Sequence, residues 1–419
     1  MTTVAIGLFV FLIVLVLFQL IIMLKFCSLF WGSFEPNIER EQLPKAAVLL
    51  PLRGADPELL NTLHGLMGQD YPDYQIQIIL DSENDPSRKY VEQALSESNF
   101  EHAYVHAIEN RRQTCSPQCS AFYEAANRLD DSVDVVCTID GDVIAHDTWL
   151  QELVAPMLND SNVAITHGNR WFMPPNSGVG SMVRYLWNAA AIVPMYFLGI
   201  PWAGSFAIRH QVLKDSGLLE KWPIAVVPDA PSKKMVDDLG LKVKFVPSLI
   251  MVNRESCSLW FAHDFLKRQM MWTRTYHPNW WAVMLYAVGS TLGVVAGFAL
   301  TISSAILNYW LAFGWFLGGI GIYMLALMMF LMIEELSIRR PIRRRNESTQ
   351  WLSPVKFFLI PLMIPFTQAV YMSATLLAHF KKTVTWRAVT YHIKSPWDVT
   401  IIGDSPFQQD EKIQTNTSL

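Results

Sequence analysis

The stretch Val133-Asp-Val-Val-Cys-Thr-Ile-Asp140-Gly141-Asp142 decides the fold expected for this chain of 419 residues. Its apolar and β-branched residues are typical of a buried strand, and Gly141 lets the backbone turn where that strand ends. The two carboxylates then follow the carboxyl end of a strand, where open α/β sheets bind ligands. Paired hard oxygens at such a place suit Mg²⁺ or Mn²⁺ holding a diphosphate. An ordinary acidic turn is the alternative interpretation.

Strand-like runs alternate with helical patterns on both sides of this stretch. The strands are expected at residues 46–52, 75–80, 103–108, 133–139, 163–167 and 242–246, and the helices at 57–67, 86–96, 118–129 and 148–158. Strands that are regularly followed by helices predict an α/β domain with a mostly parallel sheet covered on both faces. Residues 43–275 have a suitable length for one such domain.

The composition predicts a membrane protein that carries this polar domain. Hydrophobic residues make up 51% of the chain and charged residues only 17%. Residues 1–26 are expected to form a transmembrane anchor, 281–333 a transmembrane hairpin, and 352–380 a third apolar segment. The first apolar run lacks a basic leader and a small-residue cleavage site, which favours an anchor over a signal peptide. No basic face with interleaved aromatic residues occurs, so we expect no nucleic-acid partner.

The densest positive cluster, Arg339-Arg-Pro-Ile-Arg-Arg-Arg345, predicts the orientation. Positive charge marks cytoplasmic loops, so the hairpin is expected to begin and end in the cytoplasm. The chain is then a multi-pass integral membrane protein whose large domain faces the cytoplasm. Pro361 and Pro365 interrupt the third segment, which is therefore either spanning or re-entrant. Residues 381–419 are interpreted as a polar tail, on the cytoplasmic side by preference.

Two further residues have both a functional and a structural interpretation. Asp81 follows the second strand, where a carboxylate can accept hydrogen bonds from a uracil ring or a ribose. It could instead cap the next helix, although Asp85 fits that role better. Asp229 is either a helix cap or a general base for an acceptor hydroxyl.

A helical segment before the hairpin places Arg268, Met271 and Trp272 on one face. Arg268 is a candidate for neutralising a leaving diphosphate, and Trp272 for stacking on a sugar or acceptor. The alternative is an interfacial helix anchored at lipid headgroups, and both interpretations can hold together. Residues 182–202 are apolar within the polar domain, and form either a bilayer-surface segment that delivers a lipid or a core helix.

The order of these motifs resembles inverting, membrane-bound family 2-type glycosyltransferases, and most closely the ceramide glucosyltransferase branch. The resemblance covers residues 24–393. Beyond the acids, it is carried by Leu52-Arg-Gly-Ala-Asp-Pro-Glu-Leu-Leu60, Gln69-Asp-Tyr-Pro-Asp-Tyr74, Asp81–Pro86, His167-Gly168, Gly204-Ser-Phe-Ala-Ile-Arg209 and Thr385-Trp386-Arg387-x-x-x-Tyr391.

The resemblance implies a GT-A-type fold and transfer of a sugar, glucose by preference, from a UDP-sugar to a lipid hydroxyl with inversion. It implies the following site residues: Arg53, Asp81, Asp140 and Arg268 for the nucleotide sugar, Asp140 and Asp142 for Mg²⁺ or Mn²⁺, Asp229 as catalytic base, and Trp272 for the acceptor. The acceptor would be ceramide-like or another membrane lipid. The alternatives are a processive polysaccharide synthase and a non-catalytic sugar-nucleotide-binding membrane protein.

The chain departs from the pattern of this branch at three places. Met271 stands where the (Gln/Arg)-x-x-Arg-Trp motif has its second arginine. Gln118, in Ser116-Pro117-Gln118, stands where the branch usually has the lysine of Asn-Pro-Lys, and Pro228 replaces an acid before Asp229. Two cations are thereby lost from the expected site. Arg111, Arg112 and Arg274 are the candidates to replace that charge.

Overall fold

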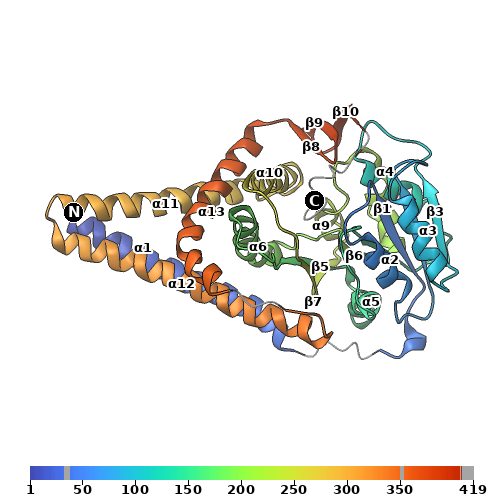
Figure 1. The fold of residues 1–419 in the computed structure, drawn as a ribbon, viewed down its shortest axis with the longest axis horizontal. Coiled ribbons are helices and arrows are strands. Elements are labelled where there is room, and N and C mark those ends of the chain that lie inside the picture. Colours follow the sequence, from blue (N-terminus) through green and yellow to red (C-terminus); the bar gives the residue numbers. More distant parts are fainter. Residues whose placement is uncertain (33–37, 350–352, 406, 408–419) are drawn as a thin grey trace.

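The structure is a computed structural model that describes residues 1–32, 38–349, 353–405 and 407. It combines an α/β part with long apolar helices, three of which project from it on the left of Figure 1 while the fourth, α13, crosses beside the α/β part.

The α/β part is built on a seven-stranded sheet in the order β3-β2-β1-β4-β6-β5-β7. The strands are β1 (Ala46–Leu52), β2 (Tyr74–Leu80), β3 (Ala103–Ala107), β4 (Val135–Ile139), β5 (Val163–Phe172), β6 (Ser205–Arg209) and β7 (Lys242–Asn253). All neighbours pair in parallel except β6, which runs antiparallel to β4 and β5. The predicted mostly parallel α/β sheet is confirmed, and β6 is a strand that the sequence analysis did not predict.

Helices cover both faces of this sheet. They are α2 (Leu59–Met67), α3 (Arg88–Glu97), α4 (Pro117–Ala126), α5 (Trp149–Asn159), α6 (Val179–Leu198), α7 (His210–Asp215), α8 (Leu218–Lys221), α9 (Ser232–Asp237) and α10 (Leu259–Tyr276). Successive residues of β1 point to opposite faces. Val48 and Leu50 therefore pack in one apolar cluster with α2 and α5, whereas Ala47 and Leu49 pack in another with α4.

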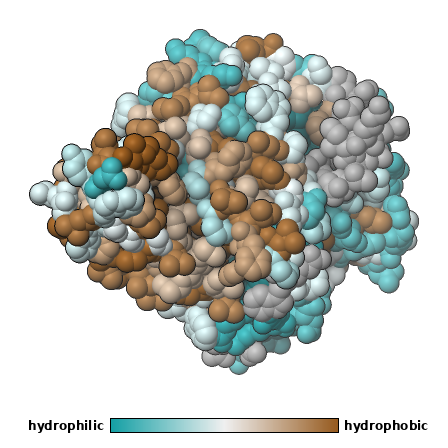
Figure 2. Space-filling model, turned by 60° about the vertical axis from the view of Figure 1, so that its left-hand side comes forward, coloured by the Kyte–Doolittle hydropathy of each residue, from teal (hydrophilic) through white to brown (hydrophobic). Residues whose placement is uncertain are grey.

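Four helices are long and apolar enough to cross a membrane: α1 (Thr2–Ser28), α11 (Trp280–Ile306), α12 (Trp310–Arg344) and α13 (Pro354–Phe380). α1 and α11 both pack along α12. Figure 2 shows hydrophobic side chains gathered over this part of the molecule. The basic cluster was predicted as a loop, but α12 includes Pro341 and continues through Arg344; arginine is a good helix former.

Two further elements matter for the site. The first part of α6 is a core helix, since Met182 to Ala189 are all buried, which favours the core alternative for that stretch. A second sheet, β10-β9-β8, is formed by β8 (Thr383–Trp386), β9 (Val389–Ser395) and β10 (Asp398–Asp404). It follows α13 at the top of Figure 1 and lies within the segment interpreted as a polar tail. We call it the C-terminal sheet.

Candidate functional site

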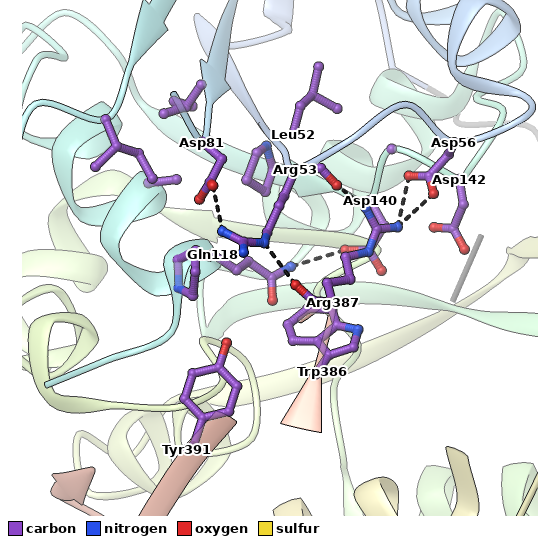
Figure 3. A pocket seen from close by; sticks show the side chains of 16 residues that line it. Leu52, Arg53, Asp56, Asp81, Gln118, Asp140, Asp142, Trp386, Arg387 and Tyr391 are labelled. Carbon is purple, nitrogen blue, oxygen red and sulfur yellow. Dashed lines mark hydrogen bonds and ion pairs between the residues drawn. The ribbon is translucent and has the colours of Figure 1, made fainter. Parts of the chain in front are cut away.

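A pocket opens at the carboxyl ends of β1, β2 and β4, where parallel strands bring their following residues to one edge of the sheet (Figure 3). The register pairs Leu52 with Leu80, so Arg53 and Asp81 emerge side by side. Asp140 and Asp142 line the same pocket from the end of β4. The opposite wall comes from the C-terminal sheet and includes Trp386, Arg387 and Tyr391.

Asp81 lies between two arginines and keeps one oxygen unpaired. Its Oδ2 accepts hydrogen bonds from Arg53 Nη1 and, at 2.7 Å, from Arg111 Nη1. Its Oδ1 is buried and has no hydrogen-bond partner among the described residues. A buried acceptor without a donor costs free energy, so this atom is suited to a ligand that brings its own N–H or O–H.

Asp85, and not Asp81, stabilises the turn before the helix that follows β2. Its carboxylate accepts hydrogen bonds from the backbone N–H of Gly54 at 3.1 Å and of Ser87 at 2.9 Å. Ser87 is the residue that precedes α3. The interpretation of Asp81 as a helix cap is therefore wrong, because Asp85 satisfies that turn.

Asp140, the first of the two carboxylates after β4, lies in a strongly perturbing environment. Burial and the neighbouring Asp142 raise the pKa of Asp140 to about 7, although Arg170 opposes the shift. Gln118 donates from Nε2 to Asp140 Oδ1 at 3.1 Å, and Arg170 Nη2 lies 3.8 Å from Asp140 Oδ2. The uncharged amide at 118 thus contacts Asp140 without neutralising it.

A divalent cation fits this donor set when a substrate completes it. In the described part of the chain, no three His, Cys, Asp or Glu side chains are grouped closely enough to hold a metal ion. Mg²⁺ and Mn²⁺ sites that hold a nucleotide commonly use one or two carboxylates, with phosphate oxygens and water as the other ligands. The repulsion between Asp140 and Asp142 is of the kind that such a cation relieves.

Asp56 and Arg387 form an ion pair that the sequence analysis did not single out. Arg387 Nη1 donates to the carbonyl oxygen of Arg53 at 2.7 Å, and the backbone oxygen of Arg387 accepts from Arg53 Nε at 2.9 Å. Figure 3 shows Arg387 pointing at Asp56, with Asp142 beside the pair. Both residues lie in stretches that carry the family resemblance, which is the signal that could have pointed to them.

Asp229 lies on the loop before α9 and does not cap that helix. Its Oδ2 accepts from the backbone N–H of Ala203 at 2.8 Å and its Oδ1 from that of Ala230 at 2.7 Å. The residue preceding α9 is Pro231. Burial raises the pKa of Asp229 despite these hydrogen bonds. A carboxylate with a raised pKa and a fixed orientation is suited to proton transfer.

One loop joins the surroundings of Asp229 and Asp140. Ala203 holds Asp229, and the next residue is Gly204. A Cβ at Gly204 would lie 2.6 Å from Asp140 Oδ2 and 2.1 Å from the Trp202 ring. Only glycine allows this close approach, so the loop brings the two acids to one region.

The residues predicted on α10 have different surroundings. The Arg268 guanidinium carbon lies 5.3 Å from the Trp386 ring centroid and 5.6 Å from that of Phe265. Met271 and Trp272 are instead buried in the apolar cluster that α10 forms with α6 and the long helices. The structure therefore brings Arg268 to the C-terminal sheet beside the pocket, but it does not bring Trp272 into the pocket wall.

None of the three candidates for the missing charge lies at Asp140. Arg111 pairs with Asp81 and Asp404, and Arg112 pairs with Glu124 at 3.3 Å. Arg274 donates to the backbone oxygens of Ala378 and Lys381, at the end of α13. Arg170 lies 3.8 Å from Asp140, and Arg387 pairs with Asp56 close enough to Asp140 and Asp142 for their charges to raise its pKa.

The sequence was compared with protein families and with curated proteins. The model of glycosyl transferase family 21 matches residues 8–398. A probable glycosyltransferase, YdaM of Bacillus subtilis (strain 168), is 23% identical over 239 residues, which are 53% of this chain and 55% of the relative. The chain thus spans about half the length of this curated relative.

Among solved structures, the mannosyltransferase PcManGT from Pyrobaculum calidifontis, in complex with GDP-Man and Mn²⁺, is similar with a TM-score of 0.50. It is 12% identical, and the match covers 90% of this chain and 99% of that one. A glucosyl-3-phosphoglycerate synthase from Mycobacterium tuberculosis matches with a TM-score of 0.37 at 15% identity, over 60% of this chain and 84% of that one. The expected GT-A-like fold is confirmed.

Proposed function

The chain belongs to glycosyl transferase family 21, and we propose that it transfers glucose from a UDP-sugar to the hydroxyl of a ceramide-like membrane lipid, with inversion. Transfer of a sugar from a nucleotide sugar follows from membership of the family. The observation that carries the proposal further is the buried, unpaired Oδ1 of Asp81 in the pocket that Asp140 and Asp142 also line.

The donor is assigned to this pocket by its chemistry. A uracil ring or a ribose supplies the N–H or O–H that Asp81 Oδ1 lacks, while Arg53 holds the other oxygen of the same carboxylate. The diphosphate then extends toward Asp140 and Asp142. Mg²⁺ or Mn²⁺ held by these two carboxylates would neutralise diphosphate charge.

Asp229 is the proposed catalytic base. It accepts the proton of the lipid hydroxyl, whose oxygen forms a bond to the anomeric carbon while the bond from that carbon to the diphosphate oxygen breaks. The electron pair of the broken bond leaves with the nucleoside diphosphate. Ala203 and Ala230 orient the Asp229 carboxylate through their backbone N–H groups, and its raised pKa makes it a stronger base.

The lipid acceptor is supported by the continuity between the domain and the long helices. One apolar cluster contains Trp272 of α10, Trp187 of α6 and Phe330 of α12. A lipid hydroxyl that remains at the membrane surface is therefore close to a domain whose packing is shared with the candidate spans. We assign the domain to the cytoplasmic side, and Trp272, which lies outside the donor pocket, to the acceptor side of the domain.

Purified full-length protein in lipid nanodiscs tests the proposal. With Mn²⁺, radiolabelled UDP-glucose should label ceramide and leave a nanodisc without added acceptor unlabelled. A parallel series with UDP-galactose, UDP-N-acetylglucosamine and GDP-mannose tests which sugar and which nucleobase the donor must carry. Transfer from GDP-mannose alone would overturn the assignment of the donor, and a water-soluble polymeric product would overturn that of the acceptor.

A further inference from the structure

The C-terminal sheet is bonded to the strand ends that form the donor pocket. Arg53 Nη2 donates to Asp404 Oδ1 at 3.0 Å and to the backbone oxygen of Ser405 at 2.7 Å. Arg111 pairs with the same carboxylate, at 2.8 Å between Nε and Oδ2. These contacts connect β10 to β1 and to the loop after β3, so the sheet is a wall of the pocket and not an independent appendage.

The turn between β8 and β9 directs Arg387 into that pocket. Arg387 and Ala388 have φ angles of 45° and 61°, which residues with a Cβ rarely adopt. This backbone strain is held by the exchange of hydrogen bonds between Arg387 and Arg53. The side chain lines the pocket between Asp56 and the pair Asp140 and Asp142, whose charges raise its pKa against the effect of burial.

Two more arginines, Arg268 and Arg170, contact a series of aromatic rings that begins with Trp386, the residue before Arg387. Arg268 lies between the rings of Trp386 and Phe265. Arg170, on β5, lies 5.9 Å from the Phe265 centroid and 4.6 Å from that of Trp202. The row of guanidinium groups and aromatic rings thus leads from the C-terminal sheet to Asp140, which Arg170 approaches to 3.8 Å.

Arg268 is held in this row at an electrostatic cost that a bound anion would reduce. Burial, Arg170 and Arg387 together lower the pKa of Arg268 to about 9. Within the described ranges Arg268 forms no hydrogen bond and no ion pair, and aromatic stacking alone neutralises no charge. Like charges that are held together away from water favour an anionic partner.

We propose that Arg170 and Arg387 bind the donor diphosphate together with Arg268, and so replace the cations missing at Met271 and Gln118. Met271 is fully buried among apolar side chains, and the Gln118 amide carries no charge, so neither position supplies the cation. Arg387 reaches the acids from the C-terminal sheet, and Arg170 reaches them from β5. Arginine is well suited to this task because its planar fork matches phosphate oxygens. The inference rests on the function proposed above.

Calorimetry on the full-length protein in detergent separates a phosphate contact from a general effect on the pocket. UDP and uridine are titrated with Mn²⁺ present into the wild type, Arg170→Gln and Arg387→Gln. We expect each variant to bind UDP about tenfold more weakly or worse, with uridine affinity unchanged, because uridine has no phosphate. Arg387→Lys should keep part of the UDP affinity.

Arg340→Gln is the matched control, since Arg340 also stacks on a tryptophan, 4.0 Å from the Trp31 centroid, but at the end of α12. It should bind UDP like the wild type. Unchanged UDP affinity in Arg170→Gln or Arg387→Gln removes that residue from the diphosphate site. An equal loss of UDP and uridine affinity shows a structural role and overturns the proposal for that residue. If the wild type does not bind UDP, the proposed function itself fails, which is a different result.

Discussion

Arg387 and Asp56 are separated by 331 residues in the sequence, yet Arg387 Nη2 lies 2.7 Å from Oδ1 and 2.9 Å from Oδ2 of Asp56. This ion pair joins the last sheet of the chain to the loop after its first strand. The pocket is consequently formed by the ends of the first strands together with the C-terminal sheet, and it also includes the acids after β4.

Asp142→Asn should abolish the metal-dependent part of UDP binding. The amide removes one of the two carboxylate charges that attract a divalent cation. Calorimetry with and without Mn²⁺ measures the effect, with Asp147→Asn, an exposed residue later in the same loop, as the control. An unchanged response to Mn²⁺ would show that Asp142 is not a metal ligand.

Asp229→Asn should leave nucleotide binding intact and lower turnover by ~10²–10⁴-fold, the range typical of losing a general base. The amide can still accept a hydrogen bond from Ala203 or Ala230, so the local fold should persist. The measurement is the transfer rate at saturating donor, alongside UDP affinity. Near-normal turnover would contradict the assignment of Asp229 as the base.

Metal-dependent binding of UDP-glucose should weaken as the pH falls from about 8 to about 6. The pKa of Asp140 is raised to about 7, so its carboxylate takes up a proton in this range, and a protonated carboxyl no longer binds the metal. UDP-glucose is the probe because its diphosphate, unlike that of UDP, has no group titrating near neutral pH.

The pKa of Asp56 is also raised to about 7, by burial against the opposing effect of Arg387. Asp56→Asn therefore serves as the control, since a pH response that persists in this variant does not come from Asp56. The metal-free affinity should change much less with pH than the metal-dependent one. A flat metal-dependent profile would contradict the role of Asp140.

Met271→Arg should destabilise the protein and should not tighten donor binding. The side chain is fully buried in an apolar cluster, and a buried charge without a partner costs several kcal/mol. Thermal unfolding is the measurement, with Met271→Leu as a control of similar volume that should cost less than about 1.5 kcal/mol. Tighter UDP binding at an unchanged Tm would show instead that an arginine at 271 reaches the phosphates.

Arg345 ties the end of the second hairpin helix to the large domain. Its Nη1 donates to the backbone oxygen of Ser248 at 2.9 Å and its Nη2 to that of Ile250, both on β7. The basic cluster and the domain should therefore lie on the same side of the membrane.

Single cysteines in a cysteine-free background test this topology in intact cells. A cysteine at Arg343 should resist an impermeant thiol reagent, whereas one at Asn308, in the turn between α11 and α12, should react. The reverse labelling pattern would invert the orientation.

The sequence by itself determined the fold class and pointed to several residues that line the pocket. Apolar runs that alternate with helical patterns led to the parallel sheet, because burial on both faces imposes that pattern. Asp81 and Asp140 were placed after predicted strands and Arg53 was implied by the resemblance; all three line one pocket, since parallel strands share an edge. The four apolar segments were also predicted, because the length and the hydropathy of a segment are read directly from the sequence.

Only the tertiary structure decided where the remaining charges lie. Arg387 reaches Asp56 because the C-terminal sheet docks on the strand ends, and Arg170 reaches Asp140 by stacking on Trp202. No local periodicity encodes such contacts, since they depend on how separate elements pack. For the same reason the sequence could not decide whether Arg111, Arg112 or Arg274 replaces the missing cations. In the structure these three side chains bind Asp81, Glu124 and the backbone oxygen of Ala378. Spacing along one helix likewise placed Met271 beside Arg268, but the packing of α10 against the long helices buried Met271 in the apolar core.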